Sequence, residues 1–279
     1  SISPMNSWYG KIKLTYAKRD RTTRVKDAYS QAPYKVQRSF HPEGDTICHS
    51  VILHTAGGLV GGDILSQDVR LHPHAEANLT TVAASKVYRS NGHPATQTAN
   101  FQLEDNAYLE YFPRETILFD GAVFRQETRV ELGENAVWLG WEILRFGRTA
   151  RGERFESGSW RSQTEIWRNG TPLWIDRSCL EGGSTLLDSP NGLNGFPVVA
   201  TFAIIGKPVS EEILKKGRSL WQTRDTQGDV GLTCLESGLV CRYCGRSTQA
   251  VLDGFLELWQ LFRGIDRQTS AVKSRFWQI

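Results

Sequence analysis

The stretch SVILHTAGGLVGGDILSQDVRLHPHAEANLTTVAASKVYRSN, residues 50–91, decides the fold that we expect for this chain. A short apolar run leads into a loop with four glycines in six positions, and the loop ends at Asp63. Glycine adopts positive φ at little cost, so this loop indicates a tight turn or a close approach of backbone. Two segments with alternating apolar and polar residues follow, and they predict β-strands over 65–71 and 77–83.

The same alternation continues through most of the chain. It predicts further strands over 12–16, 34–40, 98–103, 107–112, 122–132, 136–145 and 159–168. The turn dipeptide Asn169-Gly170 predicts a two-residue hairpin with a return strand over 172–179. Residues 182–197 are rich in Gly, Ser, Asn and Pro, which indicates a long functional loop or a linker. The apolar run 198–205 predicts a strand that is buried on both faces.

Two helices are expected toward the C-terminus. Ser210 and Ser247 are N-cap residues, and each precedes apolar residues at near-helical spacing. We therefore predict a mainly β fold with two α-helices in one domain over 1–279, of which residues 1–9 are flexible. No sequence repeat of fixed period is visible, so periodicity does not indicate a regular solenoid.

Composition argues against several classes of protein. Lys and Arg number 33 against 30 Asp and Glu, and the two signs are interspersed, so a nucleic-acid-binding stripe is not expected. The longest apolar run has eight residues, too few to cross a bilayer, and the N-terminus lacks a signal peptide's apolar core. We expect a soluble, cytoplasmic protein that does not bind membranes. Its five cysteines are too few, and odd in number, for a disulfide framework.

The sequence offers several weak candidates for chemistry. Gly57 and Gly62 have the spacing of a phosphate-binding loop, but Asp63 stands where that loop needs lysine, so a tight corner is favoured. His72 and His74 could share a face and bind a metal, although exposed loop histidines are the simpler interpretation. A single C-x-x-C, Cys241 and Cys244, is half a zinc site, so ordinary thiols are favoured. The hydrolase motifs G-x-S-x-G and H-E-x-x-H are absent.

Six longer motifs carry a family resemblance. They are LHTAGGLVGGDILSQDVRL (53–71), ANLTTVAASKVYRS (77–90), YFPRETILFDGA (111–122), GWEILRFGRTARGE (140–153), DRSCLEGG (176–183) and RYCGRS (242–247), with RFW at 275–277. Together they resemble the urease accessory protein D family, called H in some species. The resemblance extends from about residue 10 to the C-terminal end.

The resemblance implies a maturation factor and not an enzyme. Members of the family bind the urease apoprotein and the accessory proteins F and G, of which G is a nickel-carrying GTPase. Together these proteins help to deliver Ni²⁺ to the urease active site, so nickel is transient and no tightly bound cofactor is expected. The implied fold is a helix-like stack of β-sheets with two helices. An unrelated β-rich hydrolase or sugar-binding domain is the reading that remains if the motif match is accidental.

The resemblance also marks polar positions. These are Asp63, Ser85, Lys86, Arg89, Glu115, Asp120, Glu142, Arg145, Arg148, Arg151 and Asp176. Oxygen ligands release late first-row metals more readily than imidazole or thiolate, so carboxylates suit the passage of nickel. Buried carboxylates without partners are costly. We therefore predict that Asp63, Glu142 and Asp176 line an internal polar path for Ni²⁺. The alternative is that they are surface or salt-bridged residues, paired for example with Arg145 or Arg148.

A second hypothesis assigns the chain a docking role only. In this alternative the protein is a scaffold that binds urease and the F protein while nickel passes elsewhere. The aromatic residues Trp259, Phe262, Phe276 and Trp277 are the predicted anchors, because interfaces favour large aromatic side chains. Core packing explains these rings nearly as well.

Overall fold

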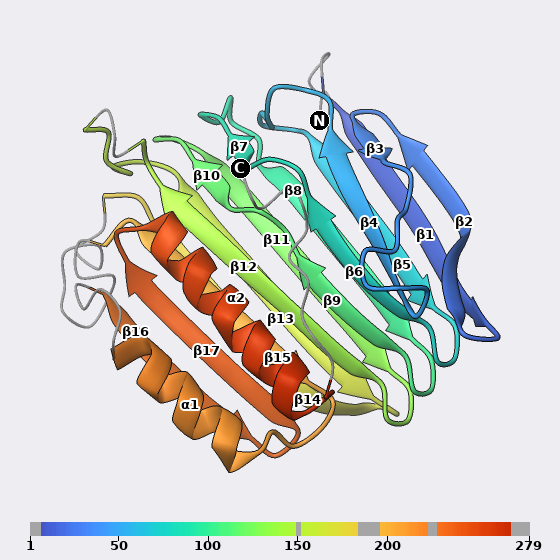
Figure 1. Ribbon diagram of the computed structural model, residues 1–279. Coiled ribbons are helices and arrows are strands. Elements are labelled where there is room, and N and C mark those ends of the chain that lie inside the picture. Colours follow the sequence, from blue (N-terminus) through green and yellow to red (C-terminus); the bar gives the residue numbers. More distant parts are fainter. Residues whose placement is uncertain (1–6, 149–151, 184–195, 223–227, 269–279) are drawn as a thin grey trace.

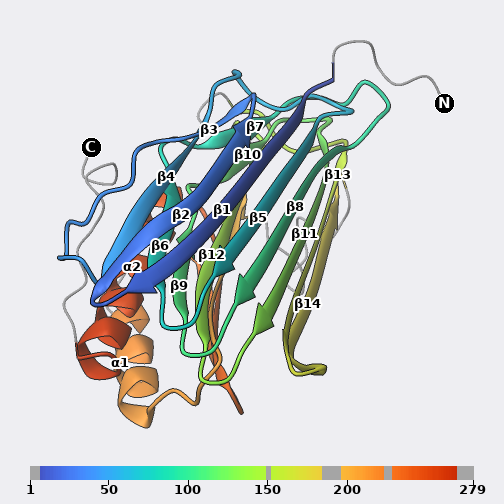
Figure 2. The ribbon, with the colours of Figure 1, turned by 90° about the vertical axis from the view of Figure 1, so that its right-hand side faces the viewer.

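Two β-sheets stacked face to face form the body of the protein, and two helices cover part of the outer face of one sheet (Figures 1 and 2). The structure is a computed structural model, and it describes residues 7–148, 152–183, 196–222 and 228–268. The chain is mainly β-strand in stacked coils, as predicted. The helices of the described residues are α1 (Glu211–Gln222) and α2 (Thr248–Ile265).

Each sheet is assembled from strands in a fixed spatial order. Sheet A runs β14 (Thr171–Glu181), β13 (Ser159–Arg168), β11 (Val123–Leu132), β8 (Ala95–Leu103), β5 (Ile64–Leu71), β1 (Tyr9–Arg19) and β2 (Thr22–Gln31). Sheet B runs β16 (Asp229–Leu235), β17 (Gly238–Gly245), β15 (Val198–Ile205), β12 (Val137–Phe146), β9 (Tyr108–Phe112), β6 (Glu76–Thr81), β4 (Ile47–His54) and β3 (Tyr34–Val36). The short strand β10 (Thr116–Leu118) pairs with β12 and with β7 (Ser85–Val87).

The chain alternates between the sheets and so forms stacked coils. Strands β4, β6, β9 and β12 lie parallel in sheet B, and the strands that follow them, β5, β8, β11 and β13, lie parallel in sheet A. Ile47, Glu76, Tyr108 and Val137 stand in one register column across sheet B. No repeated motif is needed to build such coils, because alternation alone turns one face of every strand inward.

Two separate cores hold these layers together. The first lies between the sheets and contains the inward side chains of both, among them Leu14, Leu71 and Phe101. The second lies between sheet B and the helices, where Phe202 and Phe255 are buried. Strands β9, β12, β15 and β17 of sheet B are therefore covered on both faces, which explains why β9 and β12 are more continuously apolar than the strands of sheet A.

Most predicted elements are confirmed, with shifted bounds. Asn169 and Gly170 have φ of 49° and 76°, as expected for a two-residue turn between β13 and β14. The hydroxyl oxygens of Ser210 and Ser247 accept hydrogen bonds from the amides of Ile213 and Ala250, which confirms both helix starts.

Several details were wrong or missed. The strand expected over 34–40 is only three residues long, the strand expected over 77–83 ends at Thr81, and the polar pair at 85–86 lies in a short strand that was not predicted. The hairpin formed by β16 and β17 was not predicted. Most of the segment 182–197 lies outside the described residues. Neither described helix is long and apolar enough to cross a membrane.

Candidate functional site

A polar cavity lies inside the first core, between the two sheets. This inner cavity has a volume of about 340 Å³, and its lining includes Gln67, Tyr111 and Glu142. At its outer end it is bordered by the exposed residues Gly57 and Lys86. A space this large and polar holds water or small ions more readily than an apolar void of the same size.

Hydrogen bonds fix the polar side chains of the inner cavity. Gln67 Nε2 donates to the hydroxyl of Tyr34 at 3.0 Å, and the hydroxyl of Tyr111 donates to Gln67 Oε1 at 2.9 Å. Trp160 Nε1 donates to Gln126 Oε1 at 2.9 Å. Burial raises the pKa of both tyrosines, so they stay neutral. These hydrogen bonds hold Tyr34, Gln67, Tyr111 and Gln126 in place as neutral polar groups of the lining.

Glu142 supplies the carboxylate of this cavity. The hydroxyl of Ser162 donates to Glu142 Oε2 at 3.1 Å, whereas the buried Oε1 has no hydrogen-bond partner. Burial raises the pKa of Glu142 to about 7, the hydrogen bond from Ser162 opposes this rise, and the nearby charge of Asp176 adds to it. A carboxylate oxygen without a partner is costly to bury, so it marks a place where a cation or a proton would be stabilised.

A second cavity adjoins the first at Glu142. This edge cavity has a volume of about 420 Å³ and lies between the open edges of the sheets, with Asp176, Asp229 and Arg242 in its lining. Asp176 Oδ1 accepts a hydrogen bond from Arg242 Nη2 at 2.9 Å. Glu142 lines both cavities, so the structure brings together two of the three carboxylates predicted for a polar path.

The third carboxylate, Asp63, is placed elsewhere. It is fully buried and is not among the residues that line either cavity. Its two oxygens accept hydrogen bonds from the backbone amides of Trp8 and Val60, both at 2.8 Å. Asp63 therefore ties the glycine loop to the start of β1, while Gly57, Gly58 and Leu59 of that loop border the inner cavity.

The glycine loop needs its glycines for close approach and for backbone conformation. A Cβ on Gly61 would lie 2.2 Å from Asn91 Oδ1, and Gly62 has φ of 91°. The tight corner expected from the sequence is thus confirmed, with Asp63 as its internal hydrogen-bond acceptor.

The remaining polar positions of the family motifs have separate local roles. Ser85 and Lys86 line the inner cavity. The other described positions make surface or half-buried contacts: Arg89 with Asp120, Glu115 with Arg114, Asp120 with the amides of Glu156 and Ser157, Arg145 with Thr248, and Arg148 with Glu153. None of these five lines either cavity. Arg151 lies outside the described residues.

Two of the predicted interface anchors are core residues instead. Trp259 and Phe262 are 2% and 0% exposed, because they point from α2 toward sheet B. They agree with the core-packing alternative and are not surface anchors. Phe276 and Trp277 lie outside the described residues.

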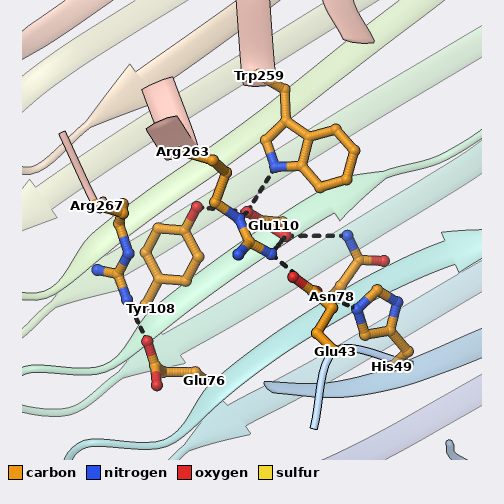
Figure 3. A network of polar contacts seen from close by, with 9 residues as sticks. All are labelled: Glu43, His49, Glu76, Asn78, Tyr108, Glu110, Trp259, Arg263 and Arg267. Carbon is orange, nitrogen blue, oxygen red and sulfur yellow. Dashed lines mark hydrogen bonds and ion pairs between the residues drawn. The ribbon is translucent and has the colours of Figure 1, made fainter. Parts of the chain in front are cut away.

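A buried ionic network under α2 was missed by the sequence analysis (Figure 3). Glu110 on β9 and Arg263 on α2 are both 0% exposed, and Arg263 Nε donates to Glu110 Oε2 at 2.7 Å. Trp259 Nε1 donates to the same oxygen at 2.6 Å, and Asn78 Nδ2 donates to Oε1 at 3.1 Å. The hydroxyl of Tyr108 also donates to this carboxylate.

The network continues to the loop before β4. Arg263 Nη2 donates to Glu43 Oε2 at 2.9 Å, and His49 Nε2 lies 2.6 Å from the same oxygen. Burial by itself would raise the pKa of Glu110, but the guanidinium of Arg263 and the surrounding hydrogen bonds hold it below its ordinary value. A sequence signal existed: Glu110 interrupts an apolar strand, and Arg263 lies on the apolar face of its helix, four residues after Trp259.

The histidine and cysteine candidates do not gather with further metal-ligating side chains in the described part of the chain. In the described residues no three His, Cys, Asp or Glu side chains converge to hold an ion. Cys241 and Cys244 are three positions apart on β17, so their thiols lie on opposite faces of the strand. Burial raises the pKa of Cys241 to about 12 and that of Cys244 to about 11. Both thiols are therefore neutral near pH 7.

Comparison with known proteins shows a match to one protein family. The profile of the family described as "UreD urease accessory protein" matches residues 9–278 of this chain. Three relatives named "Urease accessory protein UreD" match along nearly their full length. The protein from Nostoc punctiforme is 52% identical over 272 residues, 98% of this chain and 96% of the relative. The protein from Acaryochloris marina is 50% identical over 277 residues, 99% and 98% of the two chains. The protein from Synechocystis is 38% identical over 262 residues, 94% and 97%.

Proposed function

Because the chain belongs to the UreD family of urease accessory proteins, and so has a role in urease maturation, we propose that it conducts Ni²⁺ through the two adjoining cavities. In this proposal it works in the cytoplasm with the urease apoprotein and the accessory proteins F and G, and it catalyses no reaction itself. The proposal rests on the observation that Glu142 lines both cavities.

The chemistry of the cavity walls suits a cation in transit. Amide and hydroxyl oxygens belong to the lining of the inner cavity, together with the basic residues Lys86 and Arg114, and the carboxylates of Glu142 and Asp176 follow toward the edge. Such oxygen ligands hold a late first-row metal more weakly than imidazole or thiolate. Two separated carboxylates leave most of the coordination shell of Ni²⁺ to water. The metal can therefore bind briefly and leave, which a conduit requires.

Neutralising the two carboxylates tests the proposal. We expect Glu142→Gln and Asp176→Asn each to lower urease activation at limiting nickel by about tenfold, since loss of a side chain that only orients a metal ligand already costs about 10–100-fold. Activation is measured as urease activity in cells of a urease-positive host, with complex assembly followed by co-purification. Glu131→Gln, on the outer face of sheet A, is the matched control and should activate normally. Normal activation by the Glu142 and Asp176 variants would refute the conduit.

The raised pKa of Glu142 predicts a pH dependence. Folding raises this pKa from its ordinary value to about 7, so the folded chain retains a proton that the unfolded chain releases. The contribution of Glu142 to stability is therefore largest at low pH and falls as pH rises toward about 7. The other ionisable residues that line the inner cavity are Tyr34, His54, Lys86, Tyr111, Arg114 and Glu127, and those that line the edge cavity are Asp176, Asp229, Arg242, Tyr243 and Cys244.

The same titration should control cation capture. Ionised Glu142 attracts Ni²⁺ and protonated Glu142 does not, so nickel transfer should rise as the pH passes through about 7. Transfer is carried out at pH 6 and pH 8 (roughly one unit on each side of the pKa), and urease is then assayed at one fixed pH. Nickel transfer should rise less between pH 6 and pH 8 in Glu142→Gln than in the unmodified chain, because glutamine does not titrate. Identical profiles for the two proteins would contradict this assignment.

A docking role without nickel handling is the second candidate, and one surface feature favours it. Trp8, Tyr9, Tyr29, Val60 and Ile64 are large apolar side chains that are 39–53% exposed. They gather at one corner of sheet A: Tyr9 pairs with Ile64, and the amide of Ile64 donates to the carbonyl of Trp8. Exposed apolar patches often mark interaction sites. A pure scaffold predicts that cavity variants activate urease normally and that only surface variants fail.

A further inference from the structure

A salt bridge joins the two sheets at the edge cavity. Asp176 belongs to β14, the edge strand of sheet A, and Arg242 belongs to β17 of sheet B. The guanidinium donates two hydrogen bonds to one carboxylate, from Nη2 to Oδ1 at 2.9 Å and from Nη1 to Oδ2 at 3.3 Å. The cation of this pair therefore occupies the carboxylate that a metal ion would need.

Arg242 is the one basic side chain among the described residues that line this cavity, which also contains Glu142, Asp176 and Asp229. Thr201 pairs with Glu142 on one side and with Arg242 on the other, so all three share the inner face of sheet B. The guanidinium thus stands on the same face as the carboxylate of Glu142 and two strands away from it. Its positive charge opposes the entry of any other cation.

The exposure of the pair makes it easy to open. The side chains of Arg242 and Asp176 are 49% and 20% exposed. Ion pairs this exposed contribute about 0–1 kcal/mol to stability. Because the guanidinium is already half exposed to water, its solvation changes little when it leaves Asp176. The buried Arg263 differs, because it has no solvent-exposed position to move to within the packed core.

We propose that Arg242 is a tethered counter-ion that competes with a divalent cation for Asp176. When a cation arrives at Asp176, the guanidinium moves into solvent, and when it returns it displaces the ion from the carboxylate. This role rests on the proposed function and adds to it a device for release, which a conduit with carboxylate ligands needs. It also assigns Asp176 two alternating partners in place of a permanent ion pair.

Removing the charge of Arg242 should strengthen metal binding. We expect Arg242→Gln in the full chain to bind Ni²⁺ up to about fivefold more tightly than the unmodified chain in calorimetric titration, which corresponds to about 1 kcal/mol. Arg129→Gln is the matched control: Arg129 is 48% exposed and pairs with Glu131 and Glu165 on the outer face of sheet A. It should leave Ni²⁺ affinity unchanged. Arg242→Lys keeps the charge without the two-pronged contact and should give an intermediate gain.

A double substitution identifies the carboxylate involved. The gain from Arg242→Gln should disappear in the Asp176→Asn background, because the competition is for that side chain. Unchanged Ni²⁺ affinity in Arg242→Gln, or a full gain without the Asp176 carboxylate, would overturn the proposal. Urease activation by the Glu142 and Asp176 variants is a separate readout. Normal activation there would refute the conduit, while the binding difference tests the counter-ion alone.

Discussion

Replacing Arg263 with methionine is expected to lower the free energy of unfolding by about 3–5 kcal/mol. The substitution leaves Glu110 fully buried without a cation, and the remaining donors, Asn78, Tyr108 and Trp259, do not neutralise it. Methionine fills most of the volume of the arginine stem, so the loss reports the missing charge more than a cavity. Urea unfolding followed by tryptophan fluorescence measures the change.

A control variant and a rescue variant accompany this test. Arg129→Met removes a half-exposed arginine from two surface ion pairs, and it should change stability by less than about 1 kcal/mol. Adding Glu110→Gln to Arg263→Met removes the unpaired charge and should recover part of the loss. Equal stability of Arg263→Met and Arg129→Met would show that the buried pair does not hold α2 on sheet B.

Replacing Asp63 with alanine is expected to lower the free energy of unfolding by about 2–4 kcal/mol, because hydrogen bonds to a charged acceptor contribute about 1.5–3 kcal/mol each. The amides of Trp8 and Val60 both lose their acceptor in a site where the carboxylate is fully buried. The same unfolding measurement applies. Asp63→Asn keeps one oxygen acceptor and should lose roughly half as much.

Nickel affinity separates this structural role from a place on the path. The carboxylate of Asp63 lines neither cavity, so Asp63→Ala should leave the Ni²⁺ affinity of the folded chain unchanged. Glu142→Gln should do the reverse, with weaker Ni²⁺ binding and no loss of stability near neutral pH. A stable Asp63→Ala chain with weakened Ni²⁺ binding would return Asp63 to the path.

The candidate site could be predicted only in part. Glu142 and Asp176 were among the polar motif positions, and the structure places both at the edge cavity. Asp63 belongs to the same set, yet its carboxylate satisfies backbone amides of the loop that it ends. Residue type cannot separate these roles, because a buried carboxylate needs partners in either case and the sequence does not name them.

Partners remote in the sequence were beyond prediction for the same reason. Glu110 and Arg263 are separated by 153 positions, and Asp176 and Arg242 by 66. Their meeting depends on how many coils are stacked and on the register between them. Neither the number of coils nor their register produces a periodic pattern in the sequence.

The sequence by itself determined the local structure: alternating residues specified strands, four glycines specified the corner before β5, and capping serines specified where the helices begin. These features are local because side-chain direction follows the backbone conformation of the same few residues. Only the tertiary structure decided which carboxylate faces a cavity, which one accepts backbone amides and which one meets an arginine. Those outcomes depend on the stacking of two sheets, and stacking is a property of the whole chain.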